Sequence, residues 1–299
     1  MMTLPLHWEM AFLLIALPIY VLAMAVTIVQ QMPLPLRNLS KGEDSSLNSD
    51  KKLNIGHLAQ GMLFTGILLH SIAIIMRGLR AGHVPLTNIY ESFIFFSWAI
   101  MVATLVISIV RRVFAISLGT IPIAVILMII ALINVRDVEP LAPILRTYWL
   151  TIHAGFSFLS YAAYTVACIA GILYLFQERE IKHKKFGFLS RFLPPLESLD
   201  QLNYFSIILG FVLLTIGIVT GAIWSKQVHG FYWQGDSKEV LSIITWVLYA
   251  LLVQIRLISK WRGRKVAYLS ILCFGFVILT FVGSGLFIPG WHSFLIKPQ

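Results

Sequence analysis

The chain has 299 residues, of which 58% are hydrophobic and 12% are charged. Soluble globular domains carry roughly 25% charged residues, so this composition argues against a soluble enzyme and predicts a membrane protein. The formal net charge of +10 does not indicate a nucleic-acid partner, because the basic residues follow the distribution of a membrane topology.

Apolar segments long enough to cross a lipid bilayer, which requires about 20 residues, recur along the whole chain. They cover residues 9–30, 57–76, 92–110, 113–134, 149–176, 203–224, 240–256 and 266–288. The first segment lacks a basic leader and is too long for the apolar part of a signal peptide, so we expect it to remain as a helix. The sequence thus predicts an all-α integral membrane protein. Its bundle of about eight transmembrane helices would form one domain over residues 1–299.

The basic residues predict how this bundle is oriented. Of the 23 Lys and Arg residues, 16 lie in the loops on one side of the predicted bundle and 7 lie on the other. The positive-inside rule places the richer side in the cytoplasm and both termini outside. Residues 37–54 are polar and predict a flexible cytoplasmic linker. We expect a multi-pass protein of the bacterial inner (cytoplasmic) membrane, with the plastid thylakoid membrane as the alternative.

The predicted outer side gathers histidines beside an unusual loop. His153 opens the fifth span, His292 follows the eighth, and His83 lies in the segment 82–92. The outer loop 224–239 combines aromatic and polar residues, namely Trp224, Phe231, Tyr232 and Trp233 with Lys226, His229, Asp236, Lys238 and Glu239. Aromatic faces stack on flat apolar ligands, and cations bind carboxylates. Since imidazoles are common axial ligands of haem iron, the loop indicates a haem platform.

Each of these residues also has a purely structural interpretation. Trp and Tyr gather at membrane interfaces, and an interfacial histidine often hydrogen-bonds a carbonyl oxygen. His70 lies within the second span. Ionisable residues there are functional candidates, although a neighbouring helix can satisfy a lone histidine. Cys168 and Cys273 lie in apolar spans without metal-binding spacing, and we interpret both as small core residues.

Several long segments, in order along the chain, resemble a single family. They are GHVPLTNIYES (82–92), WLTIHAGFSFLSYAAY (149–164), LESLDQLNYFSIILGFVLLTIGIVTGAIW (196–224), DSKE (236–239), ITWVLYA (244–250) and GWHSF (290–294). In them the chain resembles the CcsA/ResC family of system II cytochrome c biogenesis proteins, which handle haem with a tryptophan-rich outer loop. The resemblance implies that haem b, bound as a substrate, is delivered to the outer face. There it would be attached to the CxxCH cysteines of an apocytochrome c, together with a CcsB/ResB-type membrane partner.

The resemblance also implies roles for individual residues. Two outward histidines of the family ligate haem iron, and the matching positions here are His153 and His292. The chain would then be the haem-presenting subunit of a cytochrome c synthase, acting by positioning rather than acid–base chemistry. In the loop, His229 and Gly235 stand where the family usually has tryptophan. Gln254 stands where many members carry an intramembrane histidine, so we do not expect an inner haem site.

Two other functions remain open from the sequence. A haem-linked membrane regulator or assembly factor could share this fold without attaching haem, and the altered tryptophan-rich loop is compatible with that role. A small-molecule or ion transporter is the second alternative. It is disfavoured because no charged residue is central in any predicted span, and no pair of broken helices is evident.

Overall fold

The computed structural model describes residues 7–31, 45–111, 113–138, 147–184, 193–259 and 261–283. Its long helices are α1 (His7–Gln31), α2 (Ser45–Ala81), α3 (Ile89–Arg111), α4 (Ser117–Ile133), α5 (Tyr148–Lys182), α6 (Leu196–His229), α7 (Ser237–Ile258) and α8 (Arg264–Ile278). A 3-10 turn, η2 (Phe114–Ile116), precedes α4, and a π-helical turn, η5 (Leu279–Gly283), continues α8. Within the described residues there is no strand, and eight helices are long and apolar enough to span a membrane. The predicted all-α membrane fold is confirmed.

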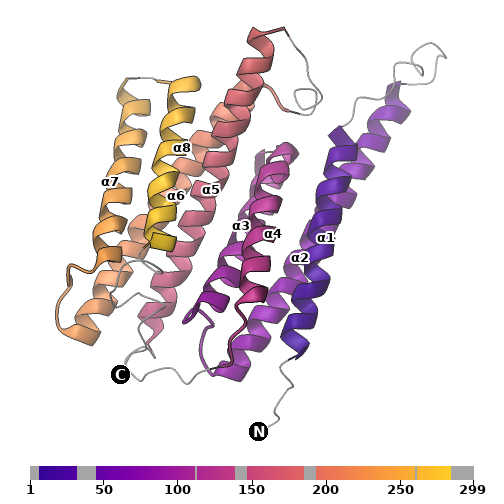
Figure 1. The fold of residues 1–299 in the computed structure, drawn as a ribbon. Coiled ribbons are helices and arrows are strands. Elements are labelled where there is room, and N and C mark those ends of the chain that lie inside the picture. The colour runs from indigo at the N-terminus through magenta and orange to yellow at the C-terminus, as the bar shows by residue number, and fades with distance from the viewer. Residues whose placement is uncertain are drawn as a thin grey trace.

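Successive helices run in opposite directions (Figure 1). The connections α2–α3, α4–α5 and α6–α7 therefore lie at one end of the bundle, called the lower end because it is at the bottom of Figure 1. The connections α1–α2, α3–α4, α5–α6 and α7–α8 lie at the upper end. Helix α1 begins at the lower end, and α8 runs back toward it.

Some elements are longer than predicted. Helix α2 begins at Ser45, so residues 45–54 are helical rather than part of a flexible linker, while residues 37–44 of that predicted linker lie outside the described residues. A polar segment extends an anchored helix readily, because propagation costs much less than nucleation. Helices α5 and α6 contain 35 and 34 residues. At about 1.5 Å per residue they exceed the ~30 Å hydrocarbon core, so each projects beyond it.

Helix α5 is the centre of the C-terminal part of the bundle. In its apolar membrane-spanning stretch, 78% of the residues are buried. It packs most extensively on α6 and also contacts α3 and α8. Gly210 of α6 allows this close approach, since a Cβ there would lie 2.5 Å from the Tyr164 ring. Asn203 of α6 donates to the Ala167 carbonyl of α5 (2.7 Å) and to the Ser270 hydroxyl of α8 (2.9 Å). Small residues and interhelical hydrogen bonds stabilise helix contacts where lipid offers no hydrophobic drive.

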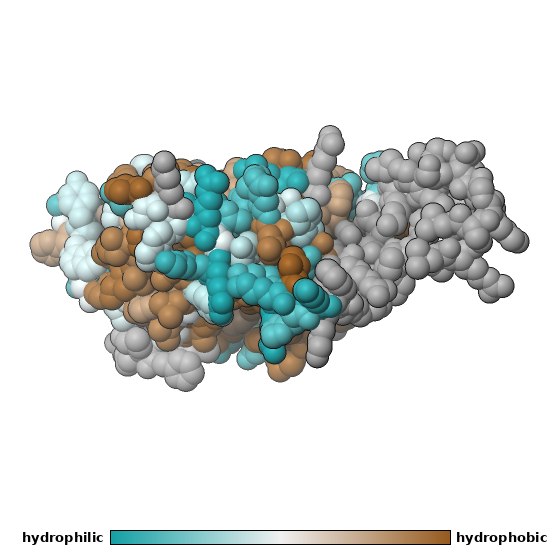
Figure 2. Space-filling model, turned by 90° about the horizontal axis from the view of Figure 1, so that it is seen from above, coloured by the Kyte–Doolittle hydropathy of each residue, from teal (hydrophilic) through white to brown (hydrophobic). Residues whose placement is uncertain are grey.

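The upper end is polar. Figure 2 looks down on this end, and hydrophilic side chains gather across its middle between hydrophobic flanks. Here Arg256 of α7 forms a bidentate ion pair with Asp200 of α6, with N···O distances of 2.9 and 2.7 Å. Its guanidinium also lies 4.3 Å from the Tyr204 ring. The pair joins α7 to α6 at this end of the bundle.

Candidate functional site

His153 lies at the lower end, in the second turn of α5. The helix begins after Thr147, whose hydroxyl accepts the Leu150 N–H (3.3 Å). The Nδ1 atom of the half-buried His153 lies 2.7 Å from the carbonyl oxygen of Gly217 in α6. Because a carbonyl can only accept, Nδ1 is the protonated nitrogen. In the neutral imidazole, Nε2 then carries the lone pair that can bind a metal.

The ring of His153 lies against α6 at two glycines, Gly217 and Gly221. A Cβ on Gly221 would lie 2.5 Å from Nδ1 and 2.7 Å from Cε1. One helical turn earlier, a Cβ on Gly217 would lie 2.9 Å from the Ser157 hydroxyl of α5. We call Gly217 and Gly221 the glycine seat of His153. It holds the imidazole against α6 by contact on one side and by the Nδ1 hydrogen bond.

The loop after α6 is shorter than the predicted 224–239 segment, because α6 continues to His229 and α7 begins at Ser237. Gly230 ends α6 with a φ of 84°, a left-handed conformation that favours glycine. The Ser225 hydroxyl donates to the Phe231 carbonyl (2.9 Å), and the Gln234 amide donates to Ser225 (3.2 Å). These bonds fold the loop 230–236 back onto the end of α6.

Glu239 fixes the other side of the loop. Its Oε2 accepts the backbone N–H groups of Gln234 and Gly235 (both 2.9 Å) and of Asp236 (3.3 Å). The side chain of Asp236 accepts the N–H of Glu239 in return, which completes a capping box at the start of α7. Asp236, predicted as a haem-contacting residue, thus has a structural role at the helix terminus.

The loop presents aromatic rings at its surface. The side chains of Phe231, Tyr232 and Trp233 are 70%, 62% and 51% exposed. Trp224 is buried, and its ring meets that of His229 edge-on, with centroids 5.8 Å apart. The loop can therefore stack on a flat ligand with its exposed rings, whereas Trp224 packs against His229 within α6.

One more contact brings a positive charge to this surface. The Nζ atom of the exposed Lys226 lies 5.4 Å from the Tyr232 ring centroid, and it donates to the Gly230 carbonyl (2.7 Å). Gly221 and His229 are eight residues apart on α6, which separates the glycine seat from the loop by about 12 Å along the helix axis. A single helix thus positions His153, a cation and the aromatic loop.

The other predicted histidines are not part of α5 or α6. His83 is in the loop 82–88 at the lower end, with Nδ1 3.0 Å from the Val84 carbonyl oxygen. His70 is fully buried in α2, and its Nδ1 lies 3.3 Å from the Tyr20 hydroxyl of α1. His292 lies outside the described residues. His153 of α5 thus lies beside Gly221 of α6, and His229 is the last residue of α6. His70 lies inside the bundle.

The glycine seat was not among the predicted site residues. Its signal was nevertheless present, since Gly217 and Gly221 form a G-x-x-x-G spacing in an apolar helix. This spacing places both glycines on one helix face and is typical of close helix contacts in membranes. What the spacing alone does not reveal is that a histidine of α5 fills the contact.

Comparison with known proteins decides the family. The family model described as cytochrome C assembly protein matches residues 86–292. The chain belongs to this cytochrome c assembly family. The matched region of this family member contains His153, the glycine seat, the loop 230–236 and His292, whereas α1 and α2 precede it. Family membership places the function of the chain in c-type cytochrome biogenesis.

Curated relatives support the same membership. The chain is 30% identical to the cytochrome c biogenesis protein CcsA of Guillardia theta over 260 residues, which cover 81% of this chain and 86% of the relative. The protein of that name from a strain of Prochlorococcus marinus is 29% identical over 292 residues, covering 88% and 89%. That of Chlamydomonas reinhardtii is 30% identical over 281 residues, covering 87% and 77%. The assembly family member therefore matches such relatives over most of their length.

Proposed function

We propose that this protein binds haem b at the lower end of the bundle and presents it for covalent attachment to the CxxCH cysteines of an apocytochrome c. The observation that carries the proposal is the orientation of His153. Its Nδ1 atom donates to the Gly217 carbonyl over 2.7 Å, so Nε2 is the nitrogen with the lone pair. A hydrogen bond of this kind fixes the tautomer of metal-binding histidines and raises their basicity.

Other residues at this end would supply the remaining contacts. His292, which follows α8 in the chain, would provide the second imidazole. The exposed rings of Tyr232 and Trp233 would stack on the porphyrin, and Lys226 beside Tyr232 would bind a propionate. His83 and His229 would be the next histidines able to contribute a nitrogen at this end.

In the proposed attachment, positioning rather than acid–base chemistry would be the main contribution of the protein. Each cysteine thiol adds across a haem vinyl group, so that a C–S bond forms and the thiol hydrogen goes to the other vinyl carbon. No oxidant is consumed and no group leaves. The contribution of this chain would be to hold the haem with its vinyl groups toward the thiols, which raises their effective concentration.

The membrane and the partner follow from the same proposal. The lower end would face outside, because 16 of the 23 basic residues belong to the connections of the upper end or to the helix ends beside them. In a bacterium this is the outer face of the cytoplasmic membrane, and in a plastid it would be the lumenal face of the thylakoid. A CcsB/ResB-type membrane protein would work beside this chain, and the apocytochrome would approach from the outer side.

The axial ligands provide the direct test. His153→Ala and His292→Ala should each lower haem occupancy, seen in the absorption spectrum of the purified protein, and should stop cytochrome c maturation in a deletion strain. Both variants should still reach the membrane, and added imidazole should partly restore function by filling the vacated coordination position. His183→Ala is the control, because His183 follows α5 at the upper end. Normal maturation by both lower-end variants would contradict the axial assignment.

A regulator or assembly factor that binds haem without attaching it is the second candidate. It is favoured by the loop 230–236, where Trp233 is the only tryptophan, while Trp224 is buried. Haem binding is expected for both functions. Maturation of a c-type cytochrome by this chain and its partner, in a strain that lacks the native pair, separates them, because only the presenting protein restores it.

A further inference from the structure

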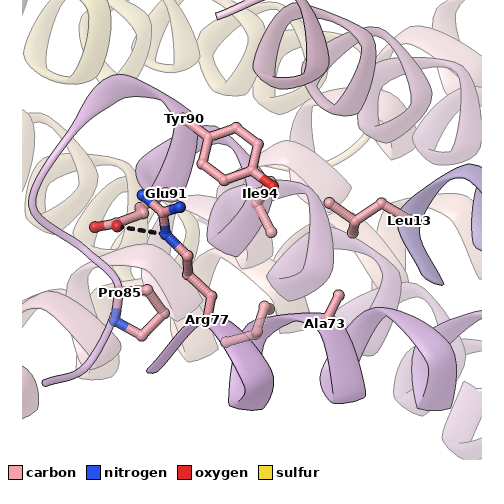
Figure 3. A pocket seen from close by; sticks show the side chains of 8 residues that line it. Leu13, Ala73, Arg77, Pro85, Tyr90, Glu91 and Ile94 are labelled. Carbon is pink, nitrogen blue, oxygen red and sulfur yellow. Dashed lines mark hydrogen bonds and ion pairs between the residues drawn. The ribbon is translucent and has the colours of Figure 1, made fainter. Parts of the chain in front are cut away.

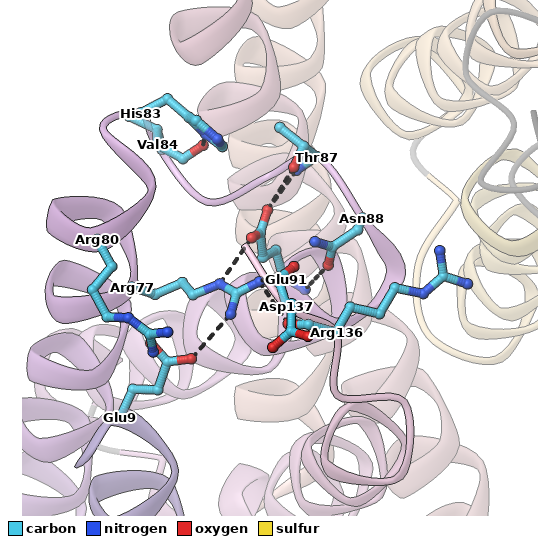
Figure 4. Close-up of polar contacts among 10 residues, drawn as sticks. All are labelled: Glu9, Arg77, Arg80, His83, Val84, Thr87, Asn88, Glu91, Arg136 and Asp137. Carbon is cyan, nitrogen blue, oxygen red and sulfur yellow. Dashed lines mark hydrogen bonds and ion pairs between the residues drawn. The ribbon is translucent and has the colours of Figure 1, made fainter. Parts of the chain in front are cut away.

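A buried arginine joins the first three helices at the lower end. Arg77 of α2 is 3% exposed. Its Nε donates to Glu91 of α3 (2.9 Å), and its Nη1 donates to Glu9 of α1 (3.1 Å). Both carboxylates are as buried as the guanidinium. Figure 4 shows the two carboxylates on either side of Arg77.

The same guanidinium also binds the chain that follows α4. Its Nη2 donates to the carbonyl oxygens of Arg136 (2.9 Å) and Asp137 (3.2 Å). The Tyr90 ring lies against it, 5.2 Å from Cζ to the centroid. Arg77 therefore connects α1, α2 and α3 with the segment 134–138, and its planar fork of donors suits several partners at once.

Glu91 links Arg77 to the loop 82–88. Its Oε1 binds Arg77, while its Oε2 accepts both the N–H (2.9 Å) and the hydroxyl (2.8 Å) of Thr87. The Asn88 side chain in turn accepts the N–H of Glu91 (2.9 Å). The carboxylate that pairs with Arg77 thus also holds the loop 82–88, which carries His83.

Burial of these charges costs desolvation free energy. Figure 3 shows Arg77 and Glu91 beside a small recess whose other walls include Leu13, Ala73 and Ile94. Arg80 completes a neutral set of two cations and two anions, 3.3 Å from Glu9. Buried ion pairs contribute little net stability compared with apolar packing, because desolvation offsets their attraction. Stability alone therefore does not explain four charges here, whereas a requirement for fixed geometry does.

We propose that Arg77 is a positioning residue of the proposed haem site. Through Glu91 it fixes the loop 82–88, and through two carbonyl oxygens it fixes the segment 134–138. Both lie at the end of the bundle where His153 lies, and both belong to helices that contact α5. The inference rests on the proposed function for the haem site. The part of it that concerns the order of the two connections can be tested without haem.

The experiment must separate positioning from charge balance. Arg77→Met alone leaves the buried Glu91 carboxylate without its cation and Glu9 with Arg80 alone, so this variant tests folding as much as position. The triple variant Glu9→Gln/Arg77→Met/Glu91→Gln removes the three most buried charges at similar volume. It leaves Arg80, whose side chain is 21% exposed and can reach water. Glu91→Gln keeps one oxygen for Thr87, so the triple variant isolates the loss of the guanidinium. Arg80→Met is the matched control, because Arg80 is on the same helix and pairs with Glu9, whereas the arginine hydrogen bonds to Glu91 and to the segment 134–138 come from Arg77.

The first readout does not depend on haem. A spin label on Val84→Cys reports the order of the loop 82–88, because Val84 is exposed there, whereas the native Cys168 and Cys273 are buried. In the triple variant the label should become several-fold more mobile, while the protein reaches the membrane in wild-type amounts. Wild-type mobility in the triple variant overturns the proposal. Failure of the triple variant to reach the membrane also overturns it, since Arg77 would then serve folding.

The second readout connects the network with haem. The triple variant should bind haem about 10-fold more weakly, as is typical when support around a ligand is lost, while Arg80→Met should bind as wild type. His153→Ala is measured in parallel. If His153→Ala loses haem and the triple variant does not, the role of Arg77 in the site is wrong and the proposed function stands. If His153→Ala keeps its haem spectrum, the axial assignment fails and the spin label alone decides whether Arg77 fixes the loop.

Discussion

At the scale of single residues, the sequence located the histidines but did not reveal their surroundings. His153 was predictable as a residue at the start of the fifth span. Its tautomer was not, because that depends on which face of α6 meets α5 and so on the 2.7 Å contact with Gly217. For Asp236 the structure adds a second role, since its side chain caps α7, and its contact with haem stays a prediction.

The glycine seat gives a prediction at this scale. A methyl group in Gly221→Ala would lie 2.5 Å from Nδ1 of His153, so the ring must leave α6 and its hydrogen bond to Gly217 must weaken. We expect haem affinity to fall by about 10-fold or more, as for other losses of support around metal-binding histidines. Spectral titration of the purified variant with haem measures this.

Gly155→Ala is the control for this change. Gly155 is two residues from His153 on α5, but a Cβ there would meet nothing within 4 Å. It should bind haem as wild type. Wild-type affinity in Gly221→Ala, together with haem loss in His153→Ala, would show that the seat is not needed to hold the ligand.

At the scale of elements, apolar length predicted the spans well and their ends poorly. Helix α6 was expected to end near Trp224 but continues to His229, because polar residues after an apolar span can extend the helix into the interface. The true end is set by Gly230 in its left-handed conformation. The start of α7 was readable, since DSKE (236–239) has the spacing of a capping box.

Glu239 should therefore control the order of the loop 230–236. Glu239→Ala removes one acceptor shared by three backbone N–H groups. Loss of a helix cap typically costs about 1 kcal/mol, so we expect local opening of this loop to become roughly 5-fold more frequent. Hydrogen exchange of peptides covering residues 230–240 measures it. Gln227→Ala, at an exposed position of α6, should leave exchange unchanged, and equal exchange in both variants would contradict the role of Glu239.

At the scale of the whole molecule, the count of spans followed from composition, while the packing of the N-terminal half did not. The topology count treats every Lys and Arg residue as a loop charge, yet Arg77 is 3% exposed between α1 and α3. The depth of a charge near a helix end depends on helix rotation and length, and α2 continues to Ala81. Its carboxylate partners, Glu9 and Glu91, are far apart in sequence, so no local pattern revealed the network.

The orientation of the bundle is the last prediction, and it belongs to the molecule as a whole. The connections of the upper end and the helix ends beside them contain 16 of the 23 Lys and Arg residues, and such an excess is retained in the cytoplasm. Fluorescent-protein fusions after Gln30 and after Lys265 should fluoresce, since that reporter folds inside the cell. An alkaline phosphatase fusion after Gln299 should be active, since that enzyme requires the outer compartment. Each site carries both reporters in separate strains, so that one serves as the control for the other. A cytoplasmic C-terminus with a cytoplasmic upper end would mean that the chain crosses the membrane an even number of times after Lys265 instead of once. His292, which is close to the C-terminus in the sequence, could not then meet His153 on the outer face.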